Sequence, residues 1–464
     1  MKKIAKLSLV AAVAVAGLTT ANAQQLEDAI KKVEVSGSVV YRYNDYNNDI
    51  NDISATNKTV SKVGNANNGT EANQTNHYKV GLNLAAPVND FVKLNTRFLV
   101  GSATGDFAAL ETSDTGDSNV DVELSNVYFG YTGIKNTTVN VGKQGLTTPW
   151  TVATQIDGNE QTGTGILALS TFENVTLAAA YFNQTNLDNS GNLSGILKKA
   201  NPKLGLTTDA EVTALSATTI GAADIATVGV IVAAGPATID AWYADMQEVF
   251  DTYTIGTKGS VDVAGITLGA DARYTSLSLD RNVTQTLTYL NHTGTVNLTD
   301  EHDDNSLAKL TLTAKSGILS GKAVYGKTGK DGGLTALDND ASTTLLGWSV
   351  TSNGKADADF YQLVAAVDIL PELNLSANYV NVDYTNTIDR NTDGDVVGKT
   401  SSEEEEIYAQ LTYKMSKNLV SYIRYGVYTK DDSKQSFTDN THNGDSRADA
   451  VDDTRGRIQV AYTF

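Results

Sequence analysis

The chain ends in Gly456-Arg457-Ile458-Gln459-Val460-Ala461-Tyr462-Thr463-Phe464, a stretch whose residues alternate in character. Every second residue from Ile458 to Phe464 is apolar, whereas Arg457 and Gln459 fall on the opposite face of an extended strand. An apolar face toward lipid and a polar face toward a lumen are typical of a transmembrane β-barrel strand. A terminal Phe is typical of bacterial outer-membrane barrels as well. We therefore predict an all-β fold, a transmembrane antiparallel β-barrel.

The first 23 residues have the three parts of a secretory signal peptide. Three lysines within the first six residues form a positive region, Leu7 to Leu18 is a short apolar run, and Ala21-Asn22-Ala23 supplies a cleavage site. The apolar run is too short to span a bilayer as a helix. We therefore expect a signal peptide over residues 1–23 and an exported barrel domain over residues 24–464 in the outer membrane of a Gram-negative cell.

The composition excludes several classes of protein. The 464 residues include 39 Gly, 21 Tyr and no Cys, which removes metal-thiolate sites, catalytic thiols and disulfides. The formal net charge is −19, and loss of the three signal-peptide lysines lowers it to −22, which argues against a nucleic-acid partner. The four histidines lie in loops or at a strand end, and none belongs to a nucleophile motif. We expect a protein that is not an enzyme and requires no cofactor.

Alternating segments recur along the chain and predict eighteen strands. They cover residues 33–43, 78–86, 91–100, 122–131, 137–143, 166–169, 175–182, 225–233, 238–243, 253–259, 266–274, 307–314, 318–325, 360–367, 373–379, 407–414, 419–428 and 456–464. An even number places both ends of the sheet on one side of the membrane. Short turns such as Leu370-Pro371-Glu372 would face the periplasm, and long loops such as 183–224 would be extracellular. The patterns at 166–169 and 253–259 are weak, so sixteen strands is the fallback.

Aromatic residues support this topology. Each strand predicted to run outward has an aromatic residue in the lipid-facing phase near its upper end. These residues are Tyr43, Phe98, Tyr181, Tyr243, Tyr274, Tyr325, Tyr379 and Tyr425. Amphipathic rings favour the headgroup level of a bilayer and form a girdle there. Tyrosine is common in any strand, but a soluble sandwich would not place its tyrosines so regularly at one end.

Several segments carry a resemblance to a known family. They are Lys6-Leu7-Ser8-Leu9-Val10-Ala11-Ala12, Leu26-Glu27-Asp28-Ala29-Ile30, Val35-Ser36-Gly37, Tyr41-Arg42-Tyr43, Gly142-Lys143-Gln144 leading to Trp150, and the final Tyr462-Thr463-Phe464. In these segments the chain resembles the major outer membrane protein porins of Campylobacter and its relatives. The resemblance implies an eighteen-stranded, homotrimeric general porin for ions and small hydrophilic solutes, with a calcium site inside the pore.

The inward phase of the predicted strands gives the lumen a basic wall. Its cations are Arg42, Lys79, Lys93, Arg97, Arg424, Arg455 and Arg457, which become neighbours when the last strand pairs with the first. The segment from Gly145 to Gly165 carries Trp150, and in porins the equivalent third loop folds into the barrel. We therefore predict a pore constriction between Asp157 and Glu160 on this loop and five wall arginines, namely Arg42, Arg97, Arg424, Arg455 and Arg457.

Two further expectations concern ions. Charges at the entrance and the narrowest point dominate ion partition, so Asp157 and Glu160 predict a modest preference for cations. By family position the same two residues are the candidates for the calcium site. A second candidate, Asp389 to Val396, matches the first eight positions of an EF-hand loop but has Thr400 where a bidentate Glu is needed.

Two other functions stay open. Lumenal aromatic residues could stack sugars in a substrate-specific channel, and the candidates are Trp242, Tyr408, Tyr422 and Tyr428. The long loops could instead serve a surface adhesin, because exposed loops often carry binding residues. An adhesin role would not exclude a pore.

Overall fold

The computed structural model describes residues 31–53, 60–63, 72–101, 107–109, 121–156, 160–187, 223–280, 304–330, 332–390, 396–437 and 450–464. Two short strands in these ranges are β2 (Val60–Val63) and β5 (Ala108–Ala109). The long strands are β1 (Glu34–Ile53), β3 (Ala72–Pro87), β4 (Val92–Gly101), β6 (Asp121–Ile134), β7 (Thr137–Gly145), β8 (Thr162–Phe172), β9 (Val175–Thr185), β10 (Ile225–Ala234), β11 (Ala237–Met246), β12 (Phe250–Val263), β13 (Ile266–Leu279), β14 (Asp304–Ser316), β15 (Leu319–Thr328), β16 (Ala356–Leu370), β17 (Leu373–Arg390), β18 (Val396–Ser416), β19 (Leu419–Phe437) and β20 (Ala450–Thr463). No helix in the described ranges is long and apolar enough to cross a membrane.

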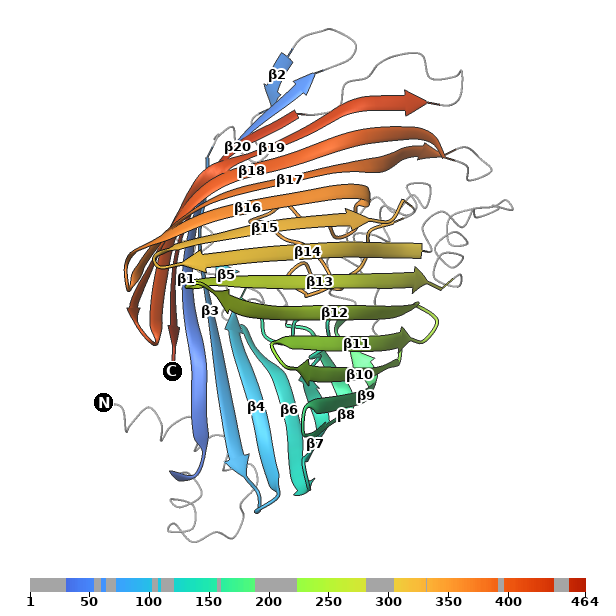
Figure 1. Ribbon diagram of the computed structural model, residues 1–464, viewed down its shortest axis with the longest axis vertical. Helices are drawn as coiled ribbons and strands as arrows, with labels where there is room; N and C mark the ends of the chain where they lie inside the picture. The colour runs from blue at the N-terminus through green and yellow to red at the C-terminus, as the bar shows by residue number, and fades with distance from the viewer. Residues whose placement is uncertain are drawn as a thin grey trace.

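The eighteen long strands of the described residues form a closed antiparallel barrel (Figure 1). Each pairs with the next long strand along the chain, and β1 also pairs with β20, which places Val39 opposite Tyr462. The predicted count of eighteen is confirmed. The fallback of sixteen is wrong, because residues 166–169 and 253–259 lie within β8 and β12. Gly and Thr occupy much of these two strands, so the residues of their two faces differ little in hydropathy.

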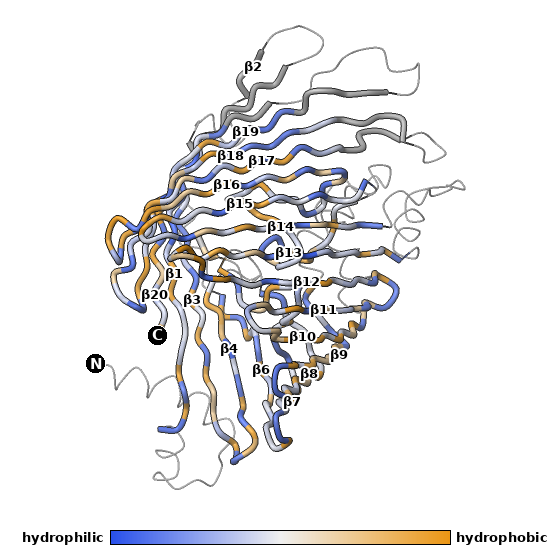
Figure 2. The backbone as a smooth tube through the Cα atoms, viewed as in Figure 1, coloured by the Kyte–Doolittle hydropathy of each residue, from blue (hydrophilic) through white to orange (hydrophobic). Residues whose placement is uncertain are grey.

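Side-chain exposure alternates along the strands. On β12, Tyr253 and Ile255 are 47% and 53% exposed, whereas Thr252 and Thr254 beside them are each 1% exposed. Figure 2 shows the same alternation as hydrophobic and hydrophilic segments along the strands. The exposed outer face is therefore apolar, and the enclosed face is polar or packed. Tyrosines predicted for the girdle lie on the outer face, among them Tyr181, Tyr243, Tyr274, Tyr325 and Tyr425.

The connections differ between the two ends of the barrel. At one end short turns join the strands, for example Ala264-Gly265 between β12 and β13, where φ is 53° and 82°. Two consecutive positive φ values are typical of a type I′ turn, whose twist matches that of the paired strands. The start of β1 and the end of β20 lie at this end too. The longer connections, including residues 146–161 and 329–355, leave the strands at the other end.

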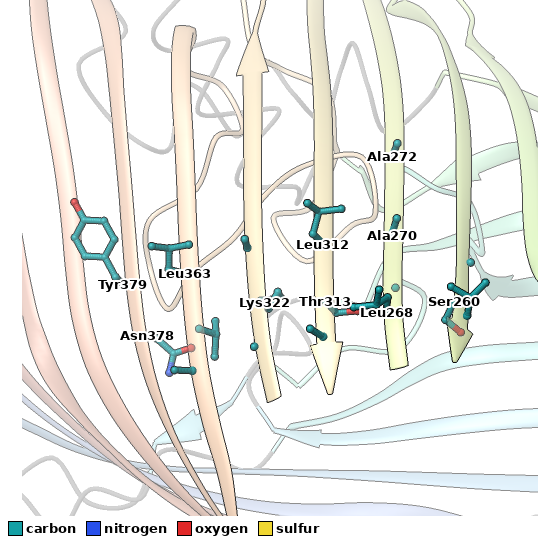
Figure 3. Close-up of a pocket in the computed structure, with 18 of the residues that line it drawn as sticks. Ser260, Leu268, Ala270, Ala272, Leu312, Thr313, Lys322, Leu363, Asn378 and Tyr379 are labelled. Carbon is teal, nitrogen blue, oxygen red and sulfur yellow. The ribbon is translucent and has the colours of Figure 1, made fainter. Parts of the chain in front are cut away.

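The outer face of β11 to β18 has an apolar groove of about 1100 Å³ (Figure 3). Leu312 on β14, Leu363 on β16 and Tyr379 on β17 lie along it. Small residues contribute much of the remaining lining, namely Gly259, Ala270, Ala314, Ala323, Ala365 and Ala377. Because these side chains are short, another apolar surface can approach the sheet closely there.

Candidate functional site

The described residues of the third loop, 146–156 and 160–161 between β7 and β8, fold into the barrel. Glu160 accepts contacts from Arg97 on β4, with Nε at 2.8 and 3.0 Å and Nη2 at 2.6 Å from its carboxylate oxygens. Ser125 Oγ on β6 donates to the same carboxylate at 2.9 Å. On β3, the strand that pairs with β4, Lys79 Nζ donates to the backbone carbonyl of Gln155 at 2.8 Å. The predicted inward fold of this loop is confirmed.

A second inward segment, residues 329–355 between β15 and β16, was not predicted. Its Leu337 N–H donates to the carbonyl of Trp150 at 2.9 Å, and Gln161 Nε2 donates to the carbonyl of Leu337 at 2.7 Å. Further bonds join the third loop to this segment: Gln155 Nε2 to Asp338 Oδ1 at 3.0 Å and Asp340 Oδ2 at 2.8 Å, and Ser342 Oγ to the Pro149 carbonyl at 3.0 Å. The two inward segments therefore form one bonded unit inside the barrel.

Two glutamates of β18 attach the second segment to the wall. Glu406 accepts hydrogen bonds from the backbone N–H groups of three consecutive residues, Trp348, Ser349 (3.0 Å) and Val350 (3.4 Å). Glu404 accepts from Lys355 Nζ at 2.6 Å and from the Tyr384 hydroxyl at 2.6 Å. Both glutamates are buried. Charge-assisted hydrogen bonds of this kind are roughly twice as strong as neutral ones, so they hold the segment in place.

Apolar packing adds to these bonds. Leu146 and Trp150 of the third loop pack with Leu337 of the second segment and with side chains of β9 to β13 such as Phe182 and Phe250. A second cluster joins Leu345 and Val350 to β14 to β18, where its members include Leu307, Phe360, Val380 and Val382. Burying each Leu or Val side chain contributes about 1.5–3 kcal/mol relative to leaving it exposed. One side of the lumen is therefore filled by a packed core.

The strands on the other side carry the predicted arginines. Arg424 on β19 lies directly opposite Arg457 on β20 in the sheet register, and Arg457 lies opposite Asn44 on β1. Arg457 Nε donates to Asn44 Oδ1 at 2.8 Å. Arg42 on β1 donates through Nε to Gln459 Oε1 at 2.8 Å. The closure of β1 on β20 thus brings these cations together.

Aromatic rings surround the arginines. The Arg424 Cζ atom lies 4.9 Å from the ring centre of Trp348, 5.0 Å from that of Tyr408 and 5.2 Å from that of Tyr422. Arg455 Cζ lies 3.9 Å from the Tyr428 ring centre. Of the aromatic residues considered for sugar stacking, Tyr408, Tyr422 and Tyr428 belong to this arrangement. Trp242 does not, because it lies on β11 against the first apolar cluster.

The structure groups the predicted constriction residues in two places. Arg42, Arg424, Arg455 and Arg457 lie on β1, β19 and β20. Arg97 instead lies on β4 with Glu160, which is 1% exposed and ion-paired. The charge of Glu160 is therefore largely balanced. Asp157 lies outside the described residues, and the role of this set as the constriction stays a prediction.

Calcium binding also stays a prediction. The Glu160 carboxylate is directed at Arg97 and Ser125, so this arrangement does not suit Glu160 as a cation ligand. The described ranges hold no group of three or more His, Cys, Asp or Glu residues that could bind a metal ion. Residues 391–395 of the EF-hand-like stretch and Asp157 lie outside those ranges.

Comparisons with known proteins agree with this architecture. The model of the Campylobacter major outer membrane protein family matches residues 1–464. The comparison with curated proteins finds no match. Among solved structures, OpdL from Pseudomonas aeruginosa has a TM-score of 0.59 and 17% identity, with 93% of this chain and 99% of that chain covered.

Two other solved structures are similar. A BenF-like porin from Pseudomonas fluorescens has a TM-score of 0.60 and 13% identity, covering 94% of this chain and 99% of that one. OccK2 from Pseudomonas aeruginosa, in complex with glucuronate, has a TM-score of 0.56 and 12% identity, covering 93% and 98%. These structural likenesses show the fold, and the whole-chain family match shows the family. The protein therefore belongs to the Campylobacter major outer membrane protein family and is a porin of the outer membrane.

Proposed function

We propose that this porin passes ions and small hydrophilic solutes by passive diffusion and modestly prefers cations. The observation that carries the proposal is the bonded unit of two inward segments within an eighteen-stranded barrel. A barrel of this size leaves an aqueous channel. Segments attached to its wall by ion pairs and packing narrow that channel, and pore width then limits the size of the solutes.

The proposed cation preference rests on charge balance. Several cations on the inward side of the barrel lie 2.6–2.9 Å from a carboxylate oxygen, so much of their field is cancelled: Arg97, Arg273, Lys355 and Arg455. The whole chain has a formal charge of −19. Acidic groups at the channel entrances would raise the local concentration of cations over about one Debye length, about 8 Å at physiological salt.

Recordings in planar bilayers test both parts of the proposal. Reconstituted protein should give ohmic, weakly voltage-dependent current steps, and a KCl gradient should give a reversal potential on the cation side. Asp157→Asn should move that potential toward anions, more at low salt because screening is weaker. Absence of steps would contradict the pore, whereas a reversal potential on the anion side would contradict only the preference.

We further propose that three copies associate as a homotrimer. The family resemblance implies this state, and the groove on β11 to β18 offers an apolar surface of small residues on which another barrel can pack closely. Cross-linking in mild detergent should yield trimers. Monomers alone would count against the proposal.

We also infer that the protein has no enzymatic activity, because its family and fold are those of channels. A phospholipase is the barrel enzyme to test. Lipid hydrolysis by purified protein, abolished by a serine reagent, would contradict the inference.

A substrate-specific channel is the second candidate function. The observation that favours it is the group of arginines and aromatic rings on β1 and β18 to β20. The structural neighbour OccK2 was solved with glucuronate, a sugar carboxylate. Saturable block of the current by a sugar would support this reading. The adhesin alternative rests on long loops, many of which lie outside the described residues.

A further inference from the structure

We propose that Arg424 and the rings around it form a lumenal subsite for small organic carboxylates. The proposal rests on the pore function above, since a solute must reach the lumen to bind there. The subsite consists of the Arg424 guanidinium on β19, Trp348 of the second inward segment, and Tyr408 and Tyr422 on the neighbouring wall.

The hydrogen bonding of Arg424 leaves donors open to a ligand. Its Nε donates to Gln410 Oε1 at 2.8 Å. Within the described residues its two Nη groups donate no hydrogen bond and no carboxylate lies within ion-pair distance. A guanidinium presents its Nη donors as a planar fork that matches the two oxygens of a carboxylate. Arg424 therefore has the donors for a bidentate anion and has not used them on the protein.

Three other inward arginines differ from Arg424 in their ion pairing. Arg97, Arg273 and Arg455 each have a carboxylate oxygen within 2.6, 2.7 and 2.9 Å, from Glu160, Asp240 and Asp453. Arg424 instead faces Arg457 across the sheet register. Like charges directly opposite each other are destabilising. A bound anion beside Arg424 would reduce this repulsion.

The surroundings of Arg424 restrict the movement of its guanidinium. Three rings lie 4.9–5.2 Å from Arg424 Cζ, and cation–π contacts strengthen where water is partly excluded. Trp348 is itself positioned, because Glu406 accepts the backbone N–H groups of Trp348 and of the two residues after it. The Trp348 ring also meets the Tyr408 ring edge-on at 5.5 Å. A fixed guanidinium loses less freedom when it binds a solute.

Block of single-channel current by sodium glucuronate tests the subsite, with glucose as the matched neutral probe. Glucuronate should reduce the current of the unmodified channel saturably, and glucose should not at the same concentrations. Arg424→Gln should raise the half-blocking concentration at least about tenfold, the size expected from a lost charge-assisted hydrogen bond. Arg424→Lys keeps the charge but not the planar fork, so its half-blocking concentration of glucuronate should lie between those of the unmodified channel and Arg424→Gln.

Lys258→Gln is the control, because Lys258 occupies an inward position on β12, a strand that pairs with none of β18, β19 and β20, and removing it deletes the same charge. It should leave the glucuronate block unchanged. Equal block of the unmodified channel and Arg424→Gln, or equal block by glucose, would overturn the subsite. Heat-modifiable mobility on gels verifies that each variant is folded. A channel with no conductance at all would contradict the pore function instead, so the two failures are distinguishable.

Discussion

At the scale of single residues, buried carboxylates act mainly as attachments for the inward segments. Glu160 binds Arg97 and Ser125, and Glu406 binds three successive backbone N–H groups. A buried carboxylate is stable only when hydrogen bonds or a counter-ion replace its water. These residues therefore determine where the segments lie, and through them the shape of the channel.

Replacing Glu406 by Gln should loosen the second segment. The change keeps the side-chain size but removes the charge and one acceptor oxygen, so the free energy of unfolding should fall by about 1–3 kcal/mol. Single-channel current should become noisier as Trp348 moves. Glu405→Gln is the control, because the neighbouring Glu405 accepts from the outward Tyr379 hydroxyl at 2.9 Å. Equal noise in the two variants would show that Glu406 does not hold the segment.

The buried pair Arg97–Glu160 should behave non-additively. Glu160→Gln leaves the Arg97 guanidinium buried without its counter-charge, which typically costs about 3–5 kcal/mol. The single variants Arg97→Leu and Glu160→Leu each leave one buried charge without its partner. The double variant Arg97→Leu with Glu160→Leu should therefore lose less free energy of unfolding than these two single variants lose together, because neither charge is left unpaired. Denaturant unfolding in detergent measures all the variants. Additive losses would mean that the two side chains do not stabilise each other.

At the scale of elements, the strands were predictable from sequence because alternation is local. Every predicted strand range falls on a long strand, even where Gly and Thr weaken the pattern in β8 and β12. The inward fold of residues 329–355 was not predictable in this way. Its attachments join residues far apart in sequence, such as Trp348 and Glu406. A signal did exist, since Leu334, Leu337, Leu345 and Val350 are too apolar for an exposed loop.

The same reason explains how much of the site was predicted. Arg42, Arg424, Arg455 and Arg457 follow from strand phase and from closure of β1 on β20. The partner of Arg97 depends on the path of the third loop, which no local pattern specifies. Likewise, the rings around Arg424 come from β18, β19 and the second inward segment, so only the folded chain brings them together.

Packing of the second segment gives a prediction at this scale. Leu345 is 7% exposed within the second apolar cluster, so Leu345→Ala should lower the free energy of unfolding by about 2–5 kcal/mol. The loosened segment should also raise the mean conductance. Ile423→Ala is the control, because Ile423 is 54% exposed on the outer face of β19. Unchanged conductance in Leu345→Ala would mean that this segment does not border the channel.

At the scale of the whole molecule, the lumen is asymmetric. The apolar clusters of the inward segments lie against β9 to β18, whereas the clustered arginines lie on β1, β19 and β20, where Trp348 of the second segment contacts Arg424 and Arg457. Solutes in the lumen would therefore meet a packed face and a basic face. The outer surface is asymmetric too, because the groove lined by small residues covers one part of the barrel wall, from Ala237 on β11 to Ile407 on β18.

This outer asymmetry gives a prediction about assembly. Ala323 lines the groove and is exposed on β15, so Ala323→Trp would fill the space where a second barrel packs. The variant should form fewer trimers, measured by cross-linking in mild detergent, while its single-barrel conductance persists. Ala179→Trp is the matched control, because Ala179 is exposed on the outer face of β9, outside the groove. If both variants remain trimeric, the groove is not the subunit interface. If both become monomeric, added bulk anywhere on the outer face disrupts assembly, and the groove has no special part in it.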